Sequence, residues 1–165
     1  MSSLRQGVWV IPLSLAAAFI VQALPLPPAV AVWTPNWVTL VMLYWCVAAP
    51  RFAGVGLGFF TGLAADVLEA TLLGQQALAK CTAAFLVVWQ RRRFRMYHLW
   101  QQACLVPLPV ALEQLVSALV RAAAGAGELD FIDLLPALTA VPAWPLLFLM
   151  LNALQRLAGL RLTGQ

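Results

Sequence analysis

The sequence predicts an all-α polytopic membrane protein that crosses the bilayer about six times. Of its 165 residues, 63% are hydrophobic and only 10% are charged, whereas soluble proteins average about 25% charged residues. The mean hydropathy is +0.88. Because each helical crossing takes about 20 apolar residues, the chain has room for about six crossings and for no soluble domain beside them. We therefore expect a single integral membrane domain over residues 1–165.

The first apolar run covers about residues 8–24 and follows one basic residue, Arg5. A cleaved signal peptide has a similar pattern, and the triplet Ala29-Val30-Ala31 resembles a cleavage site. The many later apolar runs favour an uncleaved crossing. The next run, residues 38–49, is short for a crossing, and the tryptophans of the preceding "WTPNW" suit the outer membrane interface.

Four further runs complete the predicted bundle, at about residues 52–72, 76–90, 99–124 and 134–156. The last two contain prolines, which are Pro107, Pro109, Pro136, Pro142 and Pro145. Proline removes a helical hydrogen bond, and membrane helices tolerate the loss where neighbours or water satisfy the freed carbonyls. The fifth and sixth helices are therefore expected to be kinked.

The basic residues predict the orientation of the chain. With a cytoplasmic amino terminus, eight of the ten basic residues lie on the inner side: Arg5, Arg51, Arg91, Arg92, Arg93, Arg95, Arg156 and Arg161. Lys80 and Arg121 then lie in the outer half, with the acids Glu128, Asp130 and Asp133. Cytoplasmic segments of membrane proteins carry the excess of Lys and Arg, so both termini are predicted to be cytoplasmic.

A stripe of small residues runs along the predicted third helix. Gly54, Gly58, Gly62 and Asp66 follow one another at intervals of four. Each step of four drifts by about 40° around a helix, so these residues form one slowly turning face. Small residues allow the backbones of two membrane helices to approach closely. The stripe therefore predicts a helix-packing surface, directed either at its own bundle or at a helix of a partner protein.

Buried acids in the membrane need partners. Asp66 and Glu69 share a helix face, and an ionised group in lipid costs at least about 2.5 kcal/mol. Lys80 lies at a similar depth in the next helix, because the connection is only "LLGQQ". We therefore predict an intramembrane ion pair or triad of Asp66, Lys80 and Glu69. The alternatives are a proton or ligand site, and a Glu69 side chain that simply reaches the membrane interface. Glu113 is predicted to face the bundle interior or a water-filled cavity, as a buried acid or as a contact for a partner.

The stretch "QRRRFRMYHLWQQ", residues 90–102, holds a cytoplasmic basic cluster of Arg91, Arg92, Arg93 and Arg95. Such arginines fix the topology, and each gains about 1 kcal/mol from anionic membrane lipids. A cytoplasmic protein partner is a further alternative. One short basic segment is too little for nucleic-acid binding.

The sequence offers little for catalysis. The single histidine, His98, lies at a predicted membrane interface, and no Cys/His cluster has metal-ligand spacing. Cys46, Cys81 and Cys104 all fall in apolar runs and are expected to be small core residues rather than disulfide partners. We expect no enzymatic activity, no cofactor and no metal.

Four stretches carry a family resemblance: "TPNWVTLVMLYWCVAAP" at 34–50, "GLGFFTGLAADVLEATLLGQQALA" at 56–79, "LWQQACLV" at 99–106 and "WPLLFLML" at 144–151. In order and spacing they resemble the rod-shape-determining protein MreD family. Thr34 stands where the family often has arginine, and Glu69 and Lys80 are not motif positions. The matching motif residues are Pro35, Asn36, Trp37, Tyr44, Trp45, Asp66, Gly74, Gln101, Gln102, Trp144 and Pro145.

The resemblance implies a subunit of the bacterial inner membrane that maintains rod shape during sidewall peptidoglycan synthesis. Family members act in the elongasome with MreC, with the MreB filament, and with RodA and its class B transpeptidase partner. The implied role is a membrane scaffold. Formation of a homodimer is an alternative that the resemblance does not decide. At the level of fold the family is similar to the six-helix substrate-binding components of energy-coupling-factor transporters. The alternative function is therefore binding of a vitamin-type small molecule for a membrane transporter.

Overall fold

The computed structural model describes residues 9–25, 27, 33–49, 52–126 and 134–157. These residues form helices and contain no strand. The helices are α2 (Val10–Gln22), α4 (Trp37–Ala48), α5 (Val55–Leu68), α6 (Gln75–Met96), α7 (Leu99–Leu105), α8 (Pro107–Ala123) and α9 (Leu135–Leu157). Each predicted apolar run contains a helix, and the all-helical prediction is confirmed over the described residues. The proposed cleavage triplet lies outside them.

Two helix ends differ from the prediction. The third helix stops at Leu68 rather than near residue 72, because the backbone turns there towards α6, with Gly74 in the left-handed region at φ +98°. The fourth helix continues to Met96, so the arginines that the sequence placed in a loop are helical. Long basic side chains favour the helical conformation and also suit the carboxy-terminal end of its dipole.

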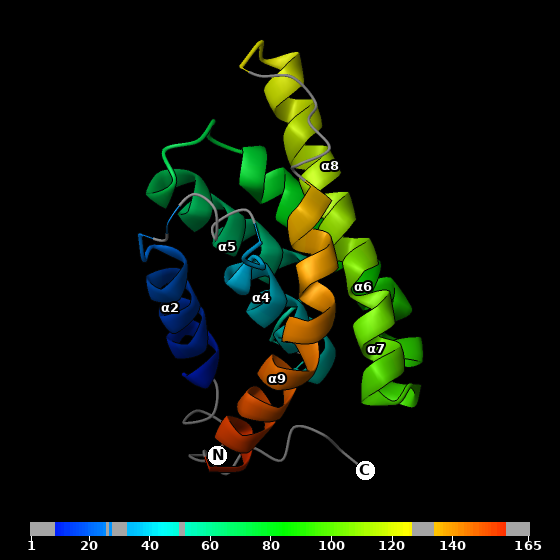
Figure 1. The fold of residues 1–165 in the computed structure, drawn as a ribbon. Coiled ribbons are helices and arrows are strands. Elements are labelled where there is room, and N and C mark those ends of the chain that lie inside the picture. Colours follow the sequence, from blue (N-terminus) through cyan, green and yellow to red (C-terminus); the bar gives the residue numbers. More distant parts are fainter. Residues whose placement is uncertain (1–8, 26, 28–32, 50–51, 127–133, 158–165) are drawn as a thin grey trace.

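Proline divides the predicted fifth helix into α7 and α8. Val106 separates them, and Pro107 occupies the first turn of α8, where its missing N–H needs no partner. Pro142 and Pro145 instead lie inside α9, which continues through both of them. Figure 1 shows that the path of α9 bends along its length, as the prolines predict.

The central helix of the bundle is α4. Every residue from Val38 to Ala48 is buried, and α4 contacts α2, α5, α6 and α9. In Figure 1 it lies in the middle, with α2 on one side and α9 passing in front of it. A helix that is apolar all round belongs in a core. Its 12 residues are too few to span a bilayer, but because it is surrounded by protein it does not have to.

Two helical stretches are long and apolar enough to cross a membrane, Leu99–Ala123 with 25 residues and Leu135–Arg156 with 22. The other apolar helices are shorter, at 13 residues for α2, 12 for α4 and 14 for α5. The described residues thus support two full crossings of the six that were predicted.

Five of the seven described basic residues gather at one end of the molecule, while Lys80 lies in the centre of the bundle and Arg121 in the last turn of α8. The start of α2, the end of α6 and the end of α9 all lie at the lower end in Figure 1. The last turn of α6 carries Arg93 and Arg95, and the last turn of α9 carries Arg156. Six residues of the predicted charge pattern lie outside the described ranges: Arg5, Arg51, Arg161, Glu128, Asp130 and Asp133.

Candidate functional site

A buried ion pair lies in the centre of the bundle and joins three helices. Lys80 of α6 places its Nζ 2.5 Å from Oε1 of Glu113 on α8, and the two side chains are 1% and 3% exposed. Thr39 of α4 bridges them, because its Oγ1 accepts from Lys80 Nζ at 3.1 Å and donates to Glu113 Oε1 at 2.8 Å. Glu113 Oε2 has no hydrogen-bond partner among the described residues. Buried charges persist when they are paired in this way.

The predicted ion pair of Lys80 with Asp66 and Glu69 is therefore wrong. The reason is the side of α6 on which α5 lies. A Cβ added to Gly58 would sit 2.8 Å from the backbone oxygen of Lys80, so α5 packs on the backbone at this position. The Lys80 side chain points away from α5, towards α4 and α8. Sequence proximity favoured the acids of α5, whereas the true partner is 33 residues further along the chain.

Asp66 instead organises the start of α6. Its carboxylate accepts from the backbone N–H groups of Gly74 at 2.8 Å, Gln76 at 2.8 Å and Ala77 at 3.3 Å. It also accepts from Thr71 Oγ1 at 2.9 Å. The first N–H groups of a helix have no partner inside the helix, and the helix dipole favours negative charge there. Asp66 is 2% exposed and fully occupied by these bonds, so it joins the turn between α5 and α6 to the first turn of α6.

Glu69 belongs to the surface. It is exposed at the end of α5, where it accepts from Gln22 Nε2 at 3.5 Å and from Gln76 Nε2 at 3.4 Å. These long contacts connect the upper ends of α2, α5 and α6. Glu69 is thus a local contact, separate from the buried ion pair.

The glycine stripe is mostly used inside the bundle. A Cβ added to Gly62 would lie 2.3 Å from the Cα of Ala77, and one added to Gly58 would lie 3.0 Å from the Cβ of Ala84. Both glycines are buried against α6. Gly54 differs, because a Cβ there would meet no atom within 4 Å. Of the two alternatives, packing within the bundle therefore accounts for Gly58, Gly62 and Asp66.

Polar motif residues of α4 connect it to its neighbours. Asn36 caps the helix by accepting from the Thr39 N–H at 3.1 Å. Trp45 Nε1 donates to Ser14 Oγ of α2 at 2.8 Å, and the Tyr44 hydroxyl donates to Asn152 Oδ1 of α9 at 2.9 Å. Trp37 packs against the rim of the core. The sequence pattern identified the aromatic residues but not their polar partners.

Trp144 and Pro145 contribute to the core from α9. The indole of Trp144 is 1% exposed and lies 6.2 Å from the ring of Phe148, which in turn makes an edge-to-face contact with Tyr44. Pro145 is half-buried within the helix. These rings fill the space between α4 and α9, and edge-to-face aromatic pairs add to the stability of a core.

The comparisons with known proteins decide the family. The model of the family described as "rod shape-determining protein MreD" matches residues 3–154. The chain belongs to the MreD family. It is 30% identical over 139 residues to "Rod shape-determining protein MreD" of Haemophilus influenzae, and the match covers 84% of this chain and 86% of that protein. No solved structure matches the chain, so the similarity to energy-coupling-factor components stays a prediction.

In this MreD family member, Gln101 and Gln102 build the elbow between α6 and α7. Gln102 Nε2 donates to the carbonyl oxygens of Phe94 at 2.8 Å and Tyr97 at 3.0 Å. Gln101 Oε1 accepts from the His98 N–H at 3.2 Å. Carbonyls at the end of one helix and an N–H at the start of the next are thereby satisfied. The two glutamines hold the bend in a fixed conformation.

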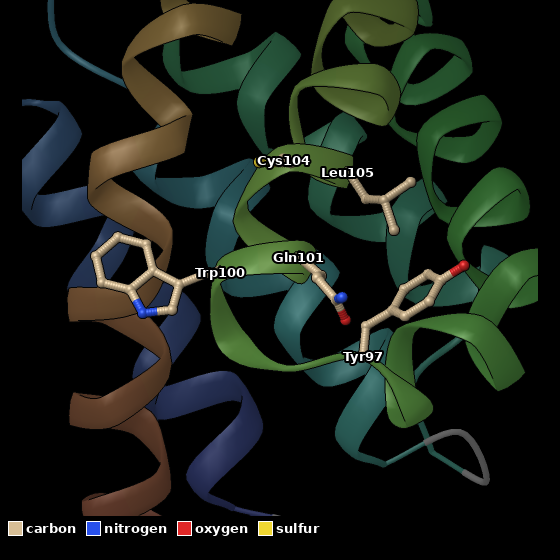
Figure 2. Close-up of a pocket in the computed structure, with 5 residues that line it drawn as sticks. All are labelled: Tyr97, Trp100, Gln101, Cys104 and Leu105. Carbon is tan, nitrogen blue, oxygen red and sulfur yellow. The ribbon is translucent and has the colours of Figure 1, made fainter.

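A surface hollow of about 480 Å³ lies at this elbow, lined by Tyr97, Trp100, Gln101, Cys104 and Leu105. Figure 2 shows the Leu105 side chain near the Tyr97 ring, with the Gln101 amide beside that ring. Cys104 is exposed here, which corrects its predicted place in the core. Arg91, Arg92, Arg93 and Arg95 occupy the preceding turns of α6.

Proposed function

We propose that this MreD family member is a non-enzymatic scaffold subunit of the bacterial cell-elongation complex. It binds MreC and links it to MreB and to RodA with its transpeptidase partner, and it thereby maintains rod shape during peptidoglycan synthesis. The observation that carries the proposal is the family match over residues 3–154. The family name itself describes determination of rod shape, and the partners are those that the sequence resemblance implies.

The internal chemistry of the bundle supports a scaffold. Lys80 Nζ and Glu113 Oε1 are bonded to each other and to Thr39, while Glu113 Oε2 has no partner among the described residues, and Asp66 is bonded to backbone N–H groups. Interior polar groups that satisfy one another stabilise one arrangement of helices. They leave the partners to be bound at the outside of the bundle. Over the described residues, no three His, Cys, Asp or Glu side chains are grouped to hold a metal ion.

The proposed location is the inner membrane, with a multi-pass chain, a single membrane domain and both termini in the cytoplasm. The gathering of Arg91, Arg92, Arg93, Arg95 and Arg156 at one end of the bundle supports this orientation. Partners on the cytoplasmic side would then meet the basic end, and MreC would meet an outer helix face within the bilayer. The vitamin-carrier alternative gains no support from the comparisons, since no solved structure matches.

Site-specific photo-crosslinking in a rod-shaped bacterium tests the MreC contact. A photoreactive residue replaces one lipid-exposed side chain on each of four helices: Leu13 on α2 (69% exposed), Phe60 on α5 (71%), Leu119 on α8 (50%) and Leu146 on α9 (69%). Leu40, which is 0% exposed, is the buried control. We expect crosslinks to MreC from one helix face and none from residue 40.

Two further readings complete the test. In the first, the tagged full chain is purified from membranes and its co-purifying proteins are identified. In the second, the same strain is depleted of its own MreD, and cell width is measured while the tagged chain is present. Recovery of MreC together with restored rod shape is the expected result. Recovery of a transport ATPase module without MreC, or crosslinks that are equally weak at all four exposed positions, would contradict the scaffold.

A further inference from the structure

The elbow between α6 and α7 combines an apolar hollow with a basic helix end. The hollow has a volume of about 480 Å³, which lies within the roughly 300–1,000 Å³ of small-ligand sites. Its lining is largely apolar, with Tyr97, Cys104 and Leu105 around it and Gln101 supplying an amide. Because the Gln102 hydrogen bonds fix the bend, the hollow is formed before any ligand arrives.

Among the described residues, the arginines of α6 have no acidic partner. Among the described residues the one ion pair is Lys80 with Glu113, and it lies in the centre of the bundle. Arg93 and Arg95 are exposed in the last turn of α6. The Tyr97 N–H donates to the Arg93 carbonyl, so Arg93 lies one helical turn before a residue that lines the hollow. A positively charged side chain and the apolar hollow therefore lie next to each other at the elbow.

Large side chains around the elbow are turned outward. Trp89 is 74% exposed, Met96 is 84% exposed and Trp100 is 79% exposed. Tryptophan and arginine together are typical of the boundary between the hydrocarbon core and the lipid headgroups. The elbow thus has the composition of a site at that boundary.

We propose that the α6–α7 elbow binds one anionic phospholipid, with the phosphate of its headgroup on Arg93 and part of an acyl chain in the hollow. The charge complementarity selects an anionic headgroup, and the apolar lining selects a chain attached to it. An acidic protein segment would match the arginines but would leave the hollow unfilled. This lipid site is independent of MreC binding.

Lipid retention by the purified full chain tests the proposal. Native mass spectrometry in detergent measures binding of added phosphatidylglycerol and, separately, of phosphatidylcholine with the same acyl chains. We expect tighter binding of phosphatidylglycerol. Arg93→Gln should weaken it by about fivefold, because an arginine near the surface contributes about a fivefold factor. Arg156→Gln, which removes a charge at the same end of the bundle on α9, should change it less than twofold.

A second variant separates a site from general attraction to charge. Cys104→Trp fills the hollow without changing any charge, and Cys104→Phe does the same with a smaller ring if the first fails to fold. Either is expected to weaken phosphatidylglycerol binding at least fivefold. Size-exclusion elution and thermal melting confirm that each variant is folded.

Four results would overturn the lipid site: equal binding of the two lipids, no loss on filling the hollow, an Arg156→Gln loss as large as that of Arg93→Gln, or no retained lipid at all. In cells, loss of a cytoplasmic protein partner from Arg93→Gln, with lipid retention unchanged, would assign Arg93 to a protein contact instead.

Discussion

Lys80→Met is the substitution that most directly tests the buried ion pair. It removes the ammonium group but keeps most of the side-chain volume, in a position that is 1% exposed. Glu113 Oε1 then loses the Lys80 Nζ contact at 2.5 Å and keeps one donor, the Thr39 hydroxyl at 2.8 Å. A carboxylate would remain in the bundle interior without its cation.

We expect Lys80→Met to lower the free energy of unfolding by about 3 kcal/mol. Removing one partner of a buried pair generally costs about 3–5 kcal/mol, and the remaining Thr39 hydrogen bond places this case at the lower end. For a chain of 165 residues, about 1 kcal/mol corresponds to a shift of about 2–4 °C in Tm. The melting temperature should therefore fall by about 6–12 °C. Replacing both partners, as Lys80→Met/Glu113→Leu, leaves no buried charge and should bring the loss back to about 1 kcal/mol.

The assay is a double-mutant cycle on the full chain, purified in a mild detergent and melted under fixed conditions. The two single variants and the double variant should give a coupling of at least about 2 kcal/mol. Asp66→Asn serves as the comparison, and its loss should add to that of Lys80→Met within about 0.5 kcal/mol, because the two residues share no hydrogen bond. Additive losses for Lys80 and Glu113, or coupling between Lys80 and Asp66, would refute the assignment.

Three other substitutions, two of them with a control substitution, test the remaining contacts through melting and local hydrogen exchange. Gly62→Ala should lower the free energy of unfolding by about 1–3 kcal/mol, because the added Cβ would lie 2.3 Å from the α6 backbone. Gly54→Ala is the control and should change it little, because a Cβ there would meet no atom within 4 Å. Asp66→Asn should lower the free energy of unfolding by about 2 kcal/mol, because its new NH₂ group would face backbone donors. Glu69→Gln, at the surface, is the control and should change the free energy of unfolding by less than about 0.5 kcal/mol. Gln102→Leu should leave two carbonyls without their side-chain donor and speed hydrogen exchange at the elbow, and unchanged exchange would contradict its role there.

Apolar runs were enough to locate the helices, because lipid and core both require continuous apolar helical segments. Helix ends were less predictable, since they depend on single contacts. The end of α5 depends on the Asp66 hydrogen bonds and on the positive φ of Gly74, neither of which a hydropathy pattern contains. The extension of α6 to Met96 runs through arginines, which favour a helix but end the apolar run, so a hydropathy pattern stops before them.

The partner of Lys80 was not predictable for a different reason. Sequence position gives the depth of a residue in the membrane, but it does not give the direction in which the side chain points from its helix. Asp66 and Glu113 are both acids within reach by depth, and the close approach of α5 at Gly58 is what turns Lys80 towards α8. The helix-packing role of the glycine stripe could be predicted from the sequence, because any helix that approaches closely needs small residues opposite it.

The polar contacts of α4 indicate where functional contacts can lie. Apolar packing alone discriminates weakly between helix arrangements in lipid, because lipid tails are as apolar as leucine. Hydrogen bonds join α4 to four other helices, through Ser14 on α2, Lys80 on α6, Glu113 on α8 and Asn152 on α9. Such bonds select one register of each neighbour against α4 and make the bundle a single body. A bundle whose interior is occupied in this way has its outer helix faces and its elbow left for partners and lipids, and substitutions there should separate loss of binding from loss of folding.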